Sequence, residues 1–285
     1  MARGGSLWTA ATAAAAVTCT AVGVLALTTR TPPHRHARHG PPVPGQTESA
    51  AARAVGWQRP LLGGDSYSVS IPLSRLRPGI TDQEILARFT RGFFGGPAFT
   101  PERWFFTLSG YQLTDVEAIQ EAVRCSSSKL EDGFAITKVG ALSSIADEMV
   151  PVIGSLLFGN FLVLDSHWVV PPPSAPLRQG FSWPTSAEDA AAATTSYIDF
   201  VYGGGERSVI SGSHRFQVSR RGKQSSSSEE PTAGCDEDAV DITFSGVTDL
   251  VGMDGMLGRQ LLGFHRLYSH LLFSDGIRRV LEAKA

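Results

Sequence analysis

Residues 240–247, VDITFSGV, and residues 257–271, LGRQLLGFHRLYSHL, decide the fold that we expect for this chain. In the first stretch apolar and polar residues alternate, which predicts a strand with one buried face. In the second stretch apolar residues recur every three or four positions and form one stripe of a long helix, namely Leu257, Leu261, Phe264, Tyr268 and Leu271. A half-buried strand that leads into such a helix predicts the α+β class, with an antiparallel sheet packed on one C-terminal helix.

The residues just upstream predict further strands of that sheet. Tyr197–Tyr202 and Val209–Val218 both have strand character, and Gly203–Gly205 forms a turn between them. Residues 220–238, RRGKQSSSSEEPTAGCDED, are too polar to pack against a core. We therefore expect a disordered loop near residues 220–239, between the last two strands.

The first part of the domain predicts short strands and helices. Residues 67–71, YSVSI, alternate as a short strand, and Thr81 with Glu84 forms a capping box that begins a helix, which Gly92 is expected to end. Residues 149–164, MVPVIGSLLFGNFLVL, are the most apolar interior stretch. Pro and Gly interrupt this stretch, and it is shorter than the roughly 20 residues of a membrane span. We expect a helical turn there, followed by a buried strand over residues 161–170.

The N-terminal region predicts a segment that lies outside this domain. Residues 7–29 carry no charge and are long enough to cross a bilayer as a helix, which favours a single-pass membrane anchor. The arginines that follow, Arg30, Arg35 and Arg38, would then place the domain in the cytosol. A mitochondrial presequence is the second interpretation, because no acidic residue precedes Glu48. A cleaved signal peptide is the third.

We divide the chain into an anchor or targeting segment over residues 1–30, a Pro/His-rich linker over 31–60, and one globular domain over 61–285. The formal net charge of −2 excludes the basic surface of a nucleic-acid-binding protein. The three cysteines have no spacing that predicts disulfides or a zinc site. The nearest approach to a dinucleotide fingerprint, at Gly203–Ser208, is followed by strand-like residues rather than by a helix. We therefore predict neither a cofactor nor a metal.

Polar residues on the predicted strands are the candidates for chemistry. His214 lies beside the glycine turn, and Asp199 and Tyr202 lie on the preceding strand. A histidine with a carboxylate can act as an acid or a base, so these three are the candidate catalytic residues. His167 and Asp165 are two positions apart and share one face of a strand. A hydrogen-bonded or solvent-facing histidine with a structural role is the alternative interpretation at both places.

Four pieces of the C-terminal third follow one another in a recognisable order. They are the Tyr-Gly turn at Tyr202-Gly203, a Gly-x-x-x-Phe-x-Val strand at residues 212–218, the alternating strand at 240–247, and a long helix with Gln260 and Tyr268. This pattern resembles a family within the START-like, helix-grip superfamily, although Ser213 and His214 replace acidic residues that the family has after the glycine. The resemblance implies a curved antiparallel sheet that grips the long helix, with an apolar cavity between them.

Members of that superfamily hold lipids, sterols, polyketides or quinones in the cavity, and some catalyse cyclisation or dehydration. The resemblance thus implies a hydrophobic small molecule as partner, with His167, Phe216, Phe264 and Tyr268 as candidate ligand contacts. Three functions stay open, because a fold does not fix a function. The first is a membrane-anchored binding protein for a lipid-, polyketide- or terpenoid-like molecule. The second is an enzyme that acts on such a molecule, and the third is a structural or assembly protein with a filled core.

Overall fold

The computed structural model describes most of the predicted domain. The described residues are 36–56, 63–126, 134–169, 195–205, 208, 210–221, 238–250 and 256–282. The apolar segment 7–29 and most of the loop predicted near 220–239 lie outside them. None of the helices in the described ranges combines the length and the apolar character that crossing a bilayer requires.

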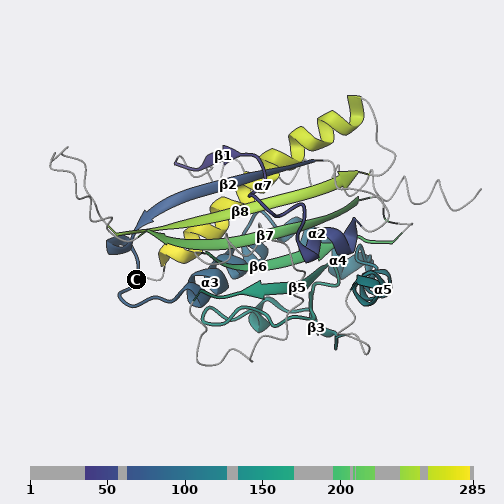
Figure 1. Ribbon diagram of the computed structural model, residues 1–285, viewed down its shortest axis with the longest axis horizontal. Helices are drawn as coiled ribbons and strands as arrows, with labels where there is room; N and C mark the ends of the chain where they lie inside the picture. Colours follow the sequence, from purple (N-terminus) through teal and green to yellow (C-terminus); the bar gives the residue numbers. More distant parts are fainter. Residues whose placement is uncertain are drawn as a thin grey trace, which may run out of the picture.

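One large sheet forms the centre of the molecule (Figure 1), and its strands follow one another in space in the order β1-β2-β8-β7-β6-β5-β4-β3. The strands are β1 (Arg38–Gly40), β2 (Gly63–Pro72), β3 (Thr137–Val139), β4 (Ser155–Leu157), β5 (Phe161–His167), β6 (Thr195–Tyr202), β7 (Ile210–Arg221) and β8 (Ala239–Leu250). Neighbouring strands are antiparallel except β3 and β4, which are parallel. The sheet is therefore mixed, whereas the sequence predicted a wholly antiparallel one.

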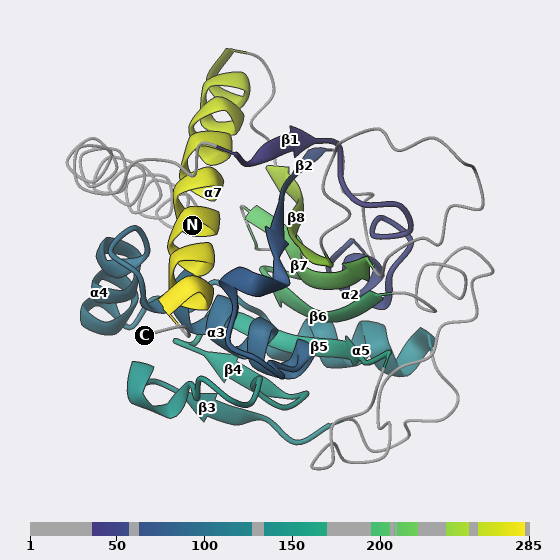
Figure 2. The same cartoon turned by 90° about the vertical axis from the view of Figure 1, so that its left-hand side faces the viewer.

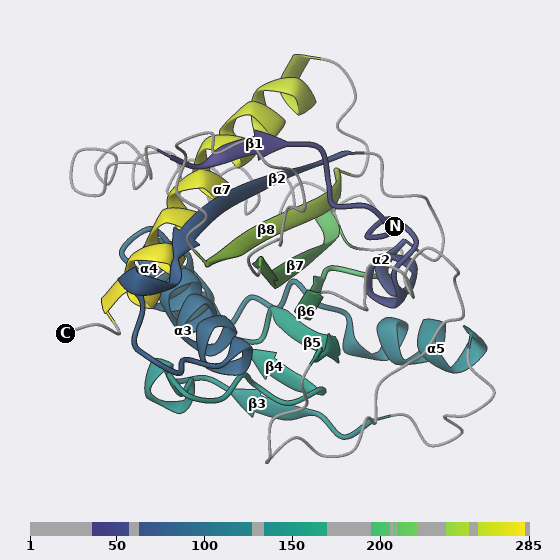
Figure 3. The ribbon, with the colours of Figure 1, turned by 60° about the vertical axis from the view of Figure 1, so that its left-hand side comes forward.

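Helices cover both faces of this sheet. On one side α3 (Asp82–Gly95) and α7 (Met256–Leu281) pack against each other and against strands, and we call this side the inner face. Figure 2 shows the sheet curving around these two helices, with α4 (Thr100–Ser109) beside α7. On the other side, the outer face, α2 (Ala50–Val55) packs against β5, β6 and β7 and against α5 (Val116–Ser126) (Figure 3). The predicted α+β class is confirmed, with the long C-terminal helix packed on the sheet.

The packed part of the chain begins earlier than the predicted boundary at residue 61. Arg38–Gly40 pairs with β2 as an edge strand, and the alanine-rich α2 packs on the outer face. Ser49 caps α2, since its hydroxyl accepts a hydrogen bond from the Ala52 amide at 3.2 Å. Small alanine side chains allow the helix to approach the sheet closely, and Ala50, Ala51 and Ala54 join a buried cluster with Leu162 and Val201.

The helix predicted to begin at Thr81 is confirmed, but its end is not where the sequence placed it. The Thr81 hydroxyl accepts a hydrogen bond from the Glu84 amide at 3.2 Å, as expected of a capping box. The helix passes through Gly92 and ends at Gly95. A Cβ at Gly92 would lie 2.6 Å from the Cβ of Arg279, so this glycine permits the close crossing of α3 and α7.

Residues 149–164 also differ in part from the expectation. They form the short strand β4 and then β5, and the helical turn predicted before the strand is replaced by extended backbone and a turn. Phe158 and Gly159 have φ values of 52° and 74°, which reverses the chain between the two strands. The strong apolar character of residues 149–164 is explained by burial, because Leu157, Leu162, Val163 and Leu164 are all fully buried.

Aromatic rings fill most of the space between the inner face and α3. Phe216 on β7 lies 4.9 Å from Phe89 and 4.8 Å from Phe93 on α3, measured between ring centroids. Phe200 on β6 contacts the same ring at 4.9 Å, and all four residues are fully buried. This part of the interior is therefore packed core, and polar groups begin where it ends.

Candidate functional site

On the inner face, residues that pair across neighbouring strands form rows that run across the sheet. Two adjacent rows differ in character, since one is aromatic and the next contains polar side chains. One row consists of Ile198, Phe216 and Phe244, and it belongs to the aromatic core. In the next row Phe200 on β6 pairs with His214 on β7, His214 pairs with Gly246 on β8, and Gly246 pairs with Asp65 on β2. Strand pairing thus places an imidazole and a carboxylate in one row, separated by a residue without a side chain.

His214 is the central residue of this site. It is 6% exposed, and its ring lies 4.9 Å from Tyr202 and 5.1 Å from Phe244. Neither ring nitrogen has a hydrogen-bond partner among the described residues. Burial, and secondarily the neighbouring His265, lower the pKa of His214 to about 3, so the ring is neutral at neutral pH. A buried polar group without a partner costs about 1–3 kcal/mol, so this one requires an explanation.

Two glycines make room for the polar rings. Tyr202, Gly212 and Thr248 form the row beyond His214, and the Tyr202 and Thr248 hydroxyls are hydrogen-bonded at 2.6 Å. A Cβ at Gly212 would lie 2.5 Å from the Tyr202 hydroxyl oxygen, so only glycine lets the Tyr202 side chain cross this strand. At Gly246 a Cβ would lie 3.4 Å from the His214 ring, so the histidine meets no side chain from that position.

Helix α7 contributes polar groups from the opposite side. The rings of His214 and His265 are stacked with centroids 6.5 Å apart. The Tyr268 hydroxyl, one turn further along α7, is buried and interacts with the Glu102 carboxyl of α4. Phe264 lies parallel to Tyr268 at 6.1 Å. Tyr268 belongs to the same buried apolar cluster as Tyr202 and Phe244, whose rings contact His214, so α7 and the sheet both present polar groups to this cluster.

Two carboxyl groups complete the surroundings. Glu102 on α4 lies near Tyr268, and burial raises the pKa of the Glu102 carboxyl to about 7. Strand pairing places Asp65 on β2 in the same row as His214. Burial lowers the pKa of His265, and the charge of Asp65 acts in the opposite direction. Burial is the first cause that raises the pKa of Tyr202 above its ordinary value, and the charges of Glu102 and Asp65 add to it. Within the described ranges, no group of three or more His, Cys, Asp or Glu residues has the geometry to hold a metal ion.

The predicted site residues divide between the two faces of the sheet. His214, Tyr202, Phe216, Phe264 and Tyr268 lie on the inner side, where Phe216 belongs to the aromatic core. Asp199 and His167 lie on the outer face, because side chains alternate along a strand and these two share the phase of Tyr197. Asp199 is thus not a partner of His214.

Asp199 has a different partner on the outer face. The Arg215 guanidinium donates two hydrogen bonds to its carboxylate, at 2.8 and 2.7 Å, and both side chains are buried. The same guanidinium lies 4.0 Å from the centroid of the Tyr197 ring, whose hydroxyl donates to Asp165 at 3.1 Å. His167 stacks on Tyr197 at 5.7 Å. All these groups are engaged with one another, which is typical of a structural network.

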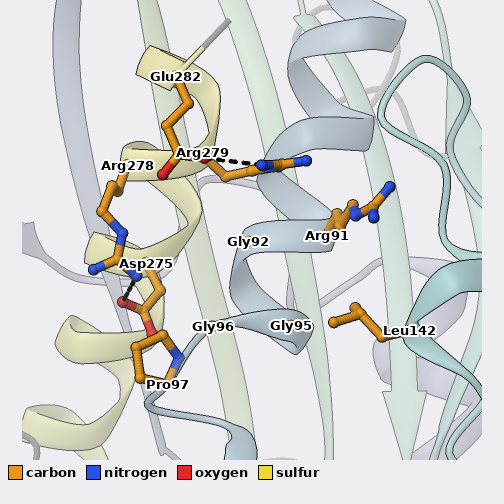
Figure 4. A pocket seen from close by; sticks show the side chains of 10 residues that line it. All are labelled: Arg91, Gly92, Gly95, Gly96, Pro97, Leu142, Asp275, Arg278, Arg279 and Glu282. Atoms are coloured by element: carbon orange, nitrogen blue, oxygen red, sulfur yellow. Dashed lines mark hydrogen bonds and ion pairs between the residues drawn. The ribbon is translucent and has the colours of Figure 1, made fainter.

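A surface pocket of about 280 Å³ lies between the C-terminal halves of α3 and α7 (Figure 4). Three arginines line it, and an unpaired set of that kind would suggest an anion site. However, Arg278 is paired with Asp275 at 2.7 Å, and Arg91 and Arg279 are paired with Asp147 at 3.4 and 2.6 Å. The pocket therefore offers no free cation to a ligand.

Three residues of the inner site were not among the sequence candidates for it: Asp65, Glu102 and His265. They come from β2, α4 and α7, so no spacing in the sequence connects them with His214. Glu102 follows a proline in the first turn of α4, where an acidic side chain ordinarily stabilises the start of a helix. In a sequence, such a residue can be recognised only as a polar side chain on an otherwise apolar face. His265 does not stand out in this way, because it lies next to the predicted apolar stripe of the C-terminal helix and not on it.

Comparison of the chain with protein-family models, with curated proteins and with solved structures finds no match. The function must therefore be derived from the site itself. The site combines aromatic walls, a neutral imidazole, a tyrosine hydroxyl and two carboxyl groups. Such a set can form a few directed hydrogen bonds to a molecule that is otherwise apolar.

Proposed function

We propose that this domain binds a small, largely apolar molecule between the inner face of the sheet and α7, with His214 and Tyr268 as its polar contacts. One observation carries the proposal: both ring nitrogens of His214 are buried without hydrogen-bond partners in the described part of the chain. Native proteins rarely leave such groups unsatisfied, and a ligand hydroxyl or carbonyl would satisfy them. The buried hydroxyl of Tyr268 lies on the same side of the sheet and interacts with the Glu102 carboxyl.

The architecture supports a helix-grip, START-like relationship. A long C-terminal helix crosses the concave side of a curved sheet, and the last strand β8 lies between β2 and β7 (Figure 2). The resemblance of the C-terminal third implied this arrangement, together with an apolar ligand held between helix and sheet. In the same proposal, residues 7–29 anchor the domain to a membrane, where apolar molecules are concentrated.

An enzyme acting on such a molecule is the second candidate function, and Glu102 is the observation in its favour. A carboxyl group with a pKa near 7, beside a tyrosine hydroxyl, can exchange a proton at neutral pH. The low pKa of His214, about 3, favours binding over catalysis, because an imidazole that is so weakly basic is a poor general base.

The binding proposal is tested with 1-octanol, which has an apolar chain and one hydroxyl. We expect isothermal titration calorimetry of the full chain to give one binding site. Tyr268→Phe removes only the buried hydroxyl, so it should weaken binding by about tenfold, the equivalent of one hydrogen bond. His214→Phe should have a similar effect.

Tyr111→Phe is the matched control, because it removes a hydroxyl from a tyrosine that is 39% exposed and outside the site. This variant should bind 1-octanol like the unmodified chain. Equal affinities of the Tyr268→Phe and Tyr111→Phe variants for 1-octanol would contradict the proposed binding site.

A further inference from the structure

The carboxylate of Asp65 gives the site an acidic character. Asp65 is 3% exposed, and its Oδ2 atom accepts no hydrogen bond from the described residues. Within the described ranges its partners are the Arg266 guanidinium at 3.9 Å and the His39 imidazole at 3.4 Å, whose side chains are 59% and 47% exposed. Solvent screens charges that are exposed to this extent, so Asp65 keeps an acceptor that is not satisfied by a close partner.

Glu102 on α4, beside Tyr268, adds a second acidic group. Burial is the main influence on the pKa of its carboxyl, and the only other one is the Tyr268 hydroxyl. The buried guanidinium of Arg215 lies on the outer face, where Asp199 binds it. Among the described residues, neither Asp65 nor Glu102 therefore forms an ion pair with a buried cation.

Resting on the proposed function, we infer that the site selects ligands whose polar end donates hydrogen bonds, as an alcohol or a protonated amine does, and that it rejects carboxylates. One ring nitrogen of the neutral His214 carries a proton, and the other ring nitrogen and Asp65 Oδ2 accept no hydrogen bond from the described residues, so an alcohol or ammonium group supplies the missing donors. A ligand carboxylate supplies none, and it adds a like charge to an interior that already holds Asp65. Discrimination of this kind arises from an unfavourable contact with the wrong ligand.

Three ligands with the same chain length test this inference: 1-octanol, octylamine and octanoate. In calorimetry with the full chain at pH 7, we expect octanoate to bind at least about tenfold more weakly than either of the other two. Asp65→Asn keeps the shape of the side chain and removes its charge, so octanoate binding should improve by about tenfold and the ratio of the 1-octanol affinity to the octanoate affinity should fall by at least as much. Should Asp65→Asn lose its native circular dichroism, Glu102→Gln is expected to shift the same ratio in the same direction.

Asp241→Asn is the control, because Asp241 lies on the outer side of β8 and is paired with Arg221. It should leave all three affinities unchanged. Octanoate binding as tightly as 1-octanol, or a ratio that does not move in Asp65→Asn and Glu102→Gln, would overturn the inference and leave the proposed function in place. Absence of binding for all three ligands would overturn the proposed function itself.

Discussion

Arg215→Met is expected to lower the free energy of unfolding by about 3–5 kcal/mol, because it leaves a buried carboxylate without its partner. In the native protein Arg215 donates two hydrogen bonds to Asp199, and the two side chains are only 6% and 1% exposed. Asp165 is close by, and burial, followed by the charge of Asp199, raises the pKa of the Asp165 carboxyl to about 7. Removal of the guanidinium therefore leaves two buried acidic groups on the outer face.

Urea unfolding followed by circular dichroism measures this effect, and Arg221→Met is its matched control. Arg221 lies on the same strand and also forms two hydrogen bonds to an aspartate, Asp241, but its side chain is 56% exposed. Exposed ion pairs contribute about 0–1 kcal/mol, so the control should unfold at nearly the same urea concentration as the unmodified chain. Similar shifts for the two variants would mean that the Arg215 pair is not buried as described.

Gly276→Ala should be the second strongly destabilising change, by about 1–3 kcal/mol. An added Cβ would lie 2.6 Å from the ring of Phe89, at the contact between α7 and α3. Phe89 cannot move aside easily, since its ring packs against Phe216 at 4.9 Å and Phe273 at 5.7 Å. The two helices would have to separate, and the aromatic core between them would loosen.

The same substitution elsewhere on α7 should have the opposite effect. Gly263 is exposed, and a Cβ there would meet nothing within 4 Å. Alanine is more favourable than glycine in a helix by about 1 kcal/mol, so Gly263→Ala should raise the free energy of unfolding. Thermal unfolding of both variants measures the difference, and two shifts of the same sign would contradict the close helix crossing.

The sequence was sufficient to predict the elements whose periodicity is regular. Alternation over 240–247 and the apolar stripe around Tyr268 correspond to β8 and α7. It was not sufficient for β1 and α2, because three residues of strand and a six-residue alanine-rich helix have no periodicity that distinguishes them from a linker. The parallel pairing of β3 with β4 depends on where the intervening chain runs, which no local pattern predicts.

The candidate site also separates what local alternation predicts from what only long-range contacts determine. Asp199 and Tyr202 are three positions apart on one strand, so alternation alone places them on opposite faces, and only Tyr202 shares the face of His214. By contrast, Asp65, His214 and His265 are brought together only by the pairing of β2, β8 and β7 and by the packing of α7 on the sheet. Such long-range contacts need the fold before they can be recognised.

Native mass spectrometry of the full chain, purified from its own host, tests the binding site most directly. The proposed function predicts one small apolar molecule per chain, and a smaller fraction of loaded chains when His214→Phe has removed the ring nitrogens. A natively folded chain that carries no such molecule, with or without the substitution, would contradict the account and favour a structural role for the domain.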